Sequence, residues 1–253
     1  MKTRIRIAAS RGFTLVEIAI VLAVAGLLLG GVLKGQELIN SAKVRAIADR
    51  QGELQKSALL FIDRYGALPG DLENASLYID NARDGSGDGF IAENESPLAF
   101  QHLTASGFLK CEVCTETSTA SSMRSRALNS PINRYGGVMS LWHDTEHYAF
   151  VSISFVRPTQ PLRLQTHTGP RIPSNIMREV DRRLDDDTPN KGRVRFNDYD
   201  PTGALEPTVE DCTEYDRGNF RSPGTMDGRA RLWRRSISWP PIVANCGGSI
   251  IIQ

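Results

Sequence analysis

The sequence lacks the short motifs of several common enzyme classes: it contains no nucleophile elbow, no phosphate-binding loop and no dinucleotide fingerprint. It also has no excess of charge of one sign, since 30 Lys and Arg stand against 29 Asp and Glu, for a net charge of +1. No nucleic-acid partner is therefore indicated. Internal repeats and low-complexity segments are missing too, and 40% hydrophobic residues describe an ordinary folded protein.

Acidic residues are absent from the first twelve positions. This segment holds four basic side chains instead, Lys2, Arg4, Arg6 and Arg11. The remaining chain has 26 basic against 29 acidic residues, so it is slightly acidic. The positive charge of the chain is thus concentrated at its start.

A single long hydrophobic run follows this basic segment. From Phe13 to Leu33 it has 21 residues, of which only Thr14 and Glu17 are polar. As a helix it would be about 31 Å long, enough to cross a bilayer core of about 30 Å. The preceding positive charges should hold the N-terminus in the cytoplasm and send the chain after Lys34 to the far side. A cleavable secretory signal and a plain membrane anchor are the simpler explanations of such a run.

Glu17 argues against both simpler explanations, because a carboxylate left unpaired in a bilayer costs roughly 2.5 to 3.5 kcal/mol. It ends the string RGFTLVE at residues 11–17, which resembles the cleavage and methylation signal of type IV prepilins and type II secretion pseudopilins. The resemblance implies that a prepilin peptidase cuts between Gly12 and Phe13 and that Phe13 is N-methylated. It also implies that Glu17 meets the N-terminal amine of a neighbouring subunit, since pairing offsets much of the cost of burying either charge.

The same resemblance implies the organisation of the whole chain. Residues 1–12 would be the cleaved leader, 13–34 the transmembrane and filament-core helix, 35–65 the amphipathic half of this spine helix, and 66–253 a globular head in the periplasm or outside the cell. The expected fold class is α+β and pilin-like, with the spine helix packed on an antiparallel sheet.

The function that this resemblance implies is structural rather than enzymatic. We expect a subunit of a type IV pilus or type II secretion pseudopilus, and a minor or specialised one because the head is large. Its partners would be other pilin or pseudopilin subunits, the prepilin peptidase and the inner-membrane assembly platform. It would cross the bacterial inner membrane once before assembly and belong to a periplasmic or extracellular filament afterwards. The alternative is a periplasmic binding protein or enzyme tethered by the helix, but a tether has no need of Glu17.

Local sequence patterns predict the helices and strands that follow the hydrophobic run. Apolar residues at helical spacing continue the spine helix to about Tyr65, where Gly66 ends it. A helix is expected from Ser96, as N-cap, to Gly107, and another at residues 174–184. Strands are expected at residues 137–142, 147–156 and 248–252, with a hairpin turn at Asp144-Thr145 and a long surface excursion at residues 200–228.

A glycine-rich segment at residues 84–95 has the ligand spacing of an EF-hand-like calcium loop. The predicted ligands are the side chains of Asp84, Ser86, Asp88 and Glu95 with the carbonyl of Phe90. Calcium takes six to eight oxygen ligands, and this spacing supplies most of them. The alternative is a glycine-rich surface turn that leads into the helix at Ser96.

The four cysteines form an even set in a chain that leaves the cytoplasm, so disulfides are predicted. We favour Cys212 to Cys246, which resembles the C-terminal disulfide loop of many pilins, and with it Cys111 to Cys114. A tetrathiolate zinc site and a thioredoxin-like redox pair are the alternatives. Neither fits well, because a second closely spaced cysteine pair and a βαβ pattern are both missing.

The string HDTEH at residues 143–147 matches the inverted zinc-protease pattern. That chemistry needs both histidines on one face of a helix, whereas this string lies between two strand-like runs. A polar hairpin is therefore the favoured interpretation.

Overall fold

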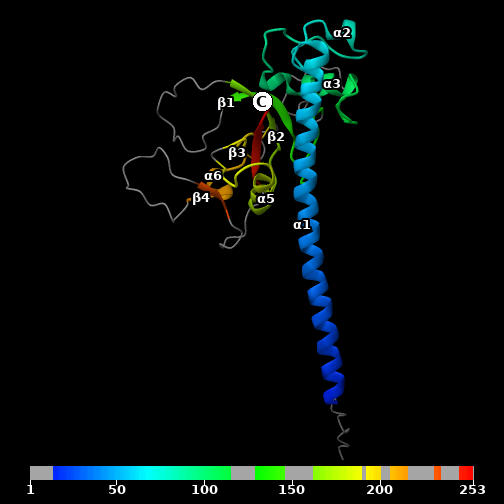
Figure 1. Ribbon diagram of the computed structural model, residues 1–253, viewed down its shortest axis with the longest axis vertical. Helices are drawn as coiled ribbons and strands as arrows, with labels where there is room; N and C mark the ends of the chain where they lie inside the picture. The colour runs from blue at the N-terminus through cyan, green and yellow to red at the C-terminus, as the bar shows by residue number, and fades with distance from the viewer. Residues whose placement is uncertain are drawn as a thin grey trace, which may run out of the picture. The chain divides into compact units, whose positions relative to one another are not determined.

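The computed structural model describes residues 14–114, 129–145, 162–189, 192–200, 206–215, 231–234 and 245–252. The chain divides into two compact units, residues 1–42 and residues 43–253. Helix α1, Leu15–Tyr65, begins in the first unit and ends in the second as one helix of 51 residues (Figure 1). This confirms the long continuous helix predicted from the sequence.

A glycine ends α1. Gly66 has a φ of 68°, and its amide donates a hydrogen bond to the carbonyl of Ile62 at 2.9 Å, a left-handed termination that favours glycine. The second half of the helix buries one face, as the helical spacing of its apolar residues predicted. The buried residues recur every three or four positions and are Val44, Ile47, Ala48, Gln51, Leu54, Ser57, Ala58 and Phe61.

The head contains a four-stranded antiparallel sheet with the strand order β1-β2-β6-β3 (Figure 1). Its strands are β1 Ser140–Thr145, β2 Leu162–His167, β3 Val194–Asn197 and β6 Gly247–Ile251. The last strand of the chain therefore lies between two earlier strands. A long N-terminal apolar helix with an antiparallel sheet makes the protein α+β, consistent with the pilin-like fold class expected.

The predicted hairpin turn at Asp144 and Thr145 is wrong. Both residues belong to β1, where they pair with Arg163 and Leu162 of β2. Their polar side chains suggested a turn, but the pairing partner lies further along the chain than the expected second strand. That expected strand, residues 147–156, lies outside the described residues, whereas the predicted C-terminal strand is present as β6.

Two head helices lie where the sequence predicted them, α3 at Ser96–Ala105 and α5 at Ser174–Leu184. The expected role of Ser96 as N-cap is wrong, because Ser96 is the first helical residue and follows a 3-10 helix, η1, Glu93–Glu95. Its hydroxyl accepts a hydrogen bond from the Leu141 amide at 2.9 Å. Ser96 therefore fastens α3 to β1 instead of capping the helix.

Two clusters of buried side chains form the core of the head. The first joins the second half of α1 to α3 and β1 and includes Leu54, Phe61, Phe100, Leu103 and Leu141. The second joins α1 to α5 and β3 and includes Ile47, Met177, Phe196, Trp233 and Cys246. The buried face of α1 is thus shared between two parts of the head.

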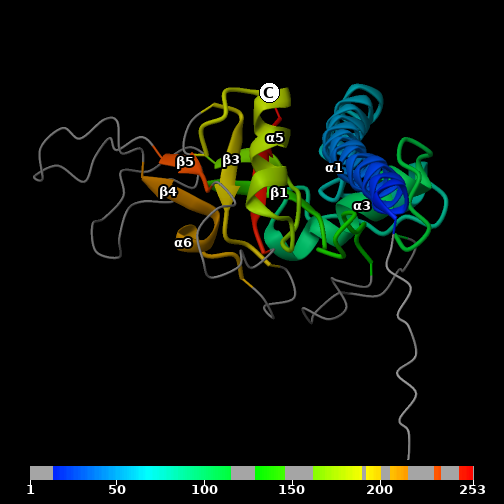
Figure 2. The same ribbon diagram turned by 90° about the horizontal axis from the view of Figure 1, so that it is seen from below.

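A small two-stranded ribbon completes the second cluster. Strand β4, Thr213–Tyr215, follows the short helix α6, Val209–Cys212, and pairs antiparallel with β5, Arg231–Trp233. Figure 2 shows α5, β3 and this ribbon next to one another, in agreement with their contacts. Cys212 and Thr213 are buried, so the surface excursion expected at residues 200–228 is wrong for this part. Another short helix, α2, Ala75–Tyr78, follows the turn after α1.

Candidate functional site

The first half of α1 presents apolar side chains to its surroundings on all sides. Leu15 is 86% exposed and Leu27 is 78% exposed. Among the described residues, α1 is the one helix long and apolar enough to cross a membrane. A helix that is apolar all round is stable when lipid or other helices cover it, so this surface requires an apolar environment.

Glu17 closes a reciprocal cap at the start of α1. Its Oε2 accepts hydrogen bonds from the Thr14 amide at 2.8 Å and from the Thr14 hydroxyl at 2.9 Å. In return, the Glu17 amide donates to the Thr14 hydroxyl oxygen at 3.2 Å. This is a capping box, in which two otherwise unpaired helical amides find acceptors. The Thr-x-x-Glu spacing is its sequence signal, and it lies inside the cleavage motif.

The predicted cleavage pair, Gly12 and Phe13, lies outside the described residues. Thr14 would be the second residue of the mature chain, so the capping box starts one residue after the predicted cut. Within one chain the carboxylate of Glu17 therefore already has donors. Its predicted pairing with the amine of a neighbouring subunit would replace or extend this local arrangement.

The four cysteines form two disulfides in the structure, Cys111–Cys114 and Cys212–Cys246, with Cα–Cα distances of 5.4 and 5.5 Å. This agrees with the favoured pairing. The sulfurs are bonded to one another and are not available as ligands of a zinc ion, and all four side chains are buried. Cys212–Cys246 joins the end of α6 to the start of β6 inside the second cluster, so it secures the C-terminal strand.

The predicted calcium loop, residues 84–95, wraps around a carboxylate from outside the loop, that of Asp71. Asp71 Oδ1 accepts hydrogen bonds from the Ser86 hydroxyl at 3.0 Å and the Asp88 amide at 2.9 Å, and Oδ2 accepts one from the Gly89 amide at 3.0 Å. Gly89 has a φ of 86°, a conformation that favours glycine. Asp71 lies thirteen residues before the loop in the sequence, and only the folded chain brings it there.

The predicted acidic ligands of this loop are engaged separately. Asp84 accepts from the amide of Ser76, Asp88 from that of Phe90 and Glu95 from that of Ala92, each at 2.9 Å. The Ser76 amide holds the pKa of Asp84 below its usual value. The structure does not gather the three carboxylates into one group of close ligand atoms. Calcium binding by Asp84, Ser86, Asp88, Phe90 and Glu95 stays a prediction.

Two histidines, the half-buried His143 and the buried His102, hold the backbone of this loop and of the residues before it. His143 Nδ1 accepts a hydrogen bond from the Ile91 amide at 3.0 Å, and His102 Nδ1 accepts one from the Gly70 amide at 2.9 Å. His102 Nε2 lies 2.6 Å from the Arg83 carbonyl, which assigns the proton to that nitrogen. Burial lowers the pKa of both histidines, so both are neutral near pH 7. Their roles in the structure are to position backbone.

The zinc-protease pattern at residues 143–147 does not have the helical setting that it needs. His143 lies in β1 and His147 lies outside the described residues. The favoured polar hairpin is also wrong, because the strand continues through Thr145.

Comparison with known families identifies the N-terminal segment. Residues 7–33 match the family model described as the prokaryotic N-terminal methylation motif. The match contains the whole RGFTLVE string, so the chain carries a prepilin-type signal of the kind found in precursors of type IV pilins and pseudopilins. No curated protein and no solved structure matches the chain.

Proposed function

We propose that the chain is a subunit of a type IV pilus or type II secretion pseudopilus, made as a prepilin and cut between Gly12 and Phe13. One combination carries the proposal: a methylation motif at residues 7–33 on an apolar helix that is exposed along its first half. A membrane would cover this helix before assembly, and the helices of other subunits would cover it in a filament.

Apolar side chains beyond the predicted membrane span favour a filament subunit over a tethered protein. Four large apolar residues of α1 remain exposed after residue 34, namely Leu38, Ile39, Leu59 and Leu60. A bilayer core accommodates about 20 helical residues, so it does not reach the last two. In a protein that is only tethered by its helix, this apolar surface would stay exposed to water, which is unfavourable. In a filament, the helices of neighbouring subunits would bury it.

The head supports a minor or specialised role within such a filament. Residues 43–253 form one compact unit with a four-stranded sheet, an additional ribbon and two disulfides. A head of this size separates neighbouring subunits or binds another component more readily than it packs into a thin repetitive fibre. The minor role predicts fewer copies per filament than a principal subunit has.

Processing is tested by mass spectrometry of the protein extracted from membranes of the cells that produce it. A mature chain that begins at Phe13 with one extra methyl group is expected. A chain that begins after the hydrophobic run, near Val32, would be the product of a secretory signal peptidase and would overturn the proposal. An uncut Met1 would do the same.

Assembly is tested by two substitutions that separate the charge of Glu17 from its capping bonds. Glu17→Gln keeps an oxygen acceptor for Thr14 but removes the negative charge needed to pair with an N-terminal amine. Thr14→Val removes the hydroxyl of the cap but keeps the charge. The sheared filament fraction should lose the Glu17→Gln protein and retain Thr14→Val.

The opposite pattern would contradict an assembly role for Glu17. If Glu17→Gln enters filaments normally while Thr14→Val does not, the carboxylate serves only as a helix cap. If both variants reach the membrane and neither changes any filament, the helix is a tether. Immunoblots of the membrane fraction control for expression of both proteins.

A further inference from the structure

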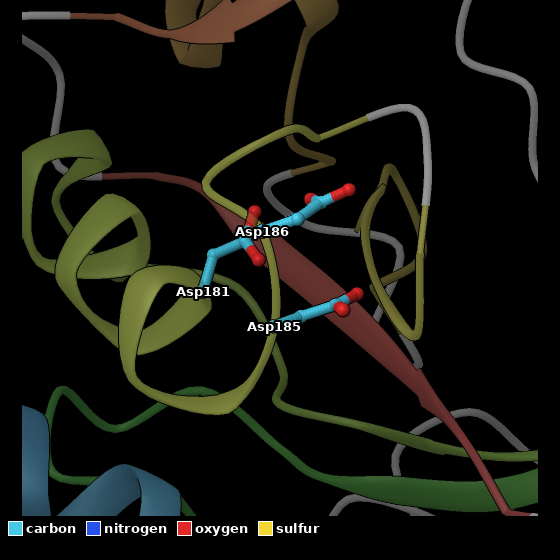
Figure 3. A group of neighbouring side chains, drawn as sticks. All are labelled: Asp181, Asp185 and Asp186. Carbon is cyan, nitrogen blue, oxygen red and sulfur yellow. The ribbon is translucent and has the colours of Figure 1, made fainter.

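Three carboxylates converge where α5 ends. Asp181 lies in the last turn of the helix, Asp185 is its C-cap residue and Asp186 follows. One oxygen from each side chain lies within 4.8 Å of the others, and Figure 3 shows the three side chains reaching toward the same side of the helix end. The C-terminus of a helix carries a partial negative charge, so this is an unfavourable place to gather acids without a cation.

The burial and hydrogen bonding of Asp181 are a second observation at the same place. The residue is fully buried, and its Oδ2 accepts a hydrogen bond from Trp233 Nε1 at 2.6 Å. Its other oxygen, Oδ1, is buried and makes no hydrogen bond of ordinary geometry in the described part of the chain, and the Asp187 amide near the carboxyl group favours its charged form. A buried carboxylate oxygen without a partner is costly, and a bound cation would remove that cost.

The fourth acid of this segment is neutralised elsewhere. Arg178 donates to both oxygens of Asp187, at 3.0 Å from Nε and 2.9 Å from Nη2. This guanidinium thus holds Asp187, which does not belong to the group of three. Among the salt bridges of the described residues, none neutralises Asp185 or Asp186.

Asp185 is held in position by the backbone of the next strand. Its Oδ2 accepts hydrogen bonds from the amides of Arg193 and Val194, the latter at 3.2 Å. Gly192 has a φ of 68°, and a Cβ at this position would collide with the Asp185 carboxylate. The conformation of the loop therefore places one carboxylate of the group before any ion arrives, as a metal site requires.

We propose that Asp181, Asp185 and Asp186 bind a hard divalent cation, with calcium as the best fit. The three side chains offer only oxygen atoms, which suit calcium or magnesium rather than zinc. Calcium tolerates irregular geometry, whereas magnesium demands a near-ideal octahedron. Water and main-chain carbonyls at the end of α5 would complete its coordination.

The ion would connect two elements of the head. Asp181 belongs to α5 and contacts β5 through Trp233, while Asp185 binds the first residues of β3. A cation between them would hold residues 185–189 and the start of β3 against the second cluster. This site is separate from the predicted loop at residues 84–95, so substitutions can test each one alone.

The first test measures binding with terbium, which shares calcium's preference for oxygen ligands and emits when a nearby indole is excited. The full chain in detergent should give terbium emission on tryptophan excitation, because Trp233 contacts Asp181, and calcium should displace the signal. Asp186→Asn, at an exposed position, should weaken binding about tenfold or more. Asp187→Asn, in the same segment with the same change of charge, should bind as the unmodified protein does.

The second test follows the melting temperature in calcium and in excess chelator. Calcium at about a hundred times its dissociation constant should raise the melting temperature by several degrees. Asp186→Asn should melt alike in both conditions, and Asp84→Asn should keep the shift. The proposal is overturned if the unmodified chain shows neither emission nor a shift, or if Asp84→Asn abolishes both while Asp186→Asn leaves them intact.

Discussion

Leu54 and Leu59 allow a matched test of how the head packs on α1. Leu54 is fully buried in the first cluster, whereas Leu59, five residues later on the same helix, is 48% exposed. Replacing either with alanine changes the helix propensity and the unfolded chain in the same way. A difference between the two variants therefore reports packing in the folded head.

The expected magnitudes follow from burial. Truncating a fully buried leucine costs about 2 to 5 kcal/mol, because transfer free energy is lost and a cavity remains. The half-exposed leucine should cost less than about 1 kcal/mol. In a unit of this size 1 kcal/mol lowers the melting temperature by about 2 to 4 °C, so a loss of about 3 kcal/mol at Leu54 corresponds to about 6 to 12 °C.

Near-ultraviolet circular dichroism of the full chain in detergent is the appropriate assay. It follows the ordered aromatic rings of the head, including Phe61, Tyr65 and Phe108, which contact one another. It is insensitive to the part of α1 inside the micelle. Equal decreases for Leu54→Ala and Leu59→Ala would refute the assignment of the buried face of α1.

Three further predictions concern polar groups in the head. Gln51 is buried on α1 with neither amide atom hydrogen-bonded in the described residues, so Gln51→Met should raise the melting temperature by a few degrees; a decrease would indicate a bound water. In chelator, the free energy of unfolding of Asp181→Asn should rise relative to that of the unmodified protein by about 3 kcal/mol between pH 4 and pH 7. Burial, with smaller contributions from Asp186 and Asp185, raises the pKa of Asp181 to about 7, so the folded protein keeps a proton that the unfolded chain releases. Urea unfolding at several pH values measures the stability of both proteins. A difference in stability that does not change with pH would contradict this prediction. A truncated chain that starts at residue 35 and is exported to the periplasm should be soluble and should show no free thiols when titrated in denaturant. Four free thiols would contradict both disulfides.

The helices could be predicted from the sequence because their signals are local. α1 has one apolar run, then an apolar residue every three or four positions, and a glycine at its end. The helix predicted at residues 174–184 is α5, and the structure has both ends where the sequence placed them. The capping box of Thr14 and Glu17 is equally local and was available from the spacing alone.

The sheet could not be derived in the same way. β1 pairs with β2, whose sequence LRLQTH has too many polar residues to stand out, and the polar end of β1 resembled a turn. β6 then inserts between strands that precede it by tens of residues. Such pairings depend on which faces the helices cover, and this information is not present in any short window of sequence.

The hydrogen bonds of Asp71 and Asp185 show why the composition of a loop alone does not locate a metal site. Both lie beside glycine-containing loops, and both accept main-chain amides: Asp71 binds the loop after Ser86, and Asp185 binds the start of β3. Asp71 has hydrogen-bond donors on both of its oxygens, so it organises backbone without needing an ion, whereas the amides at Asp185 occupy Oδ2 alone. What sets the end of α5 apart is the unfilled, buried oxygen of Asp181, together with Asp186 beside it. That oxygen is identified only after every hydrogen bond around it is known. Ligand spacing along the sequence therefore predicts a calcium loop at residues 84–95, but it gives no sign of the group at the end of α5.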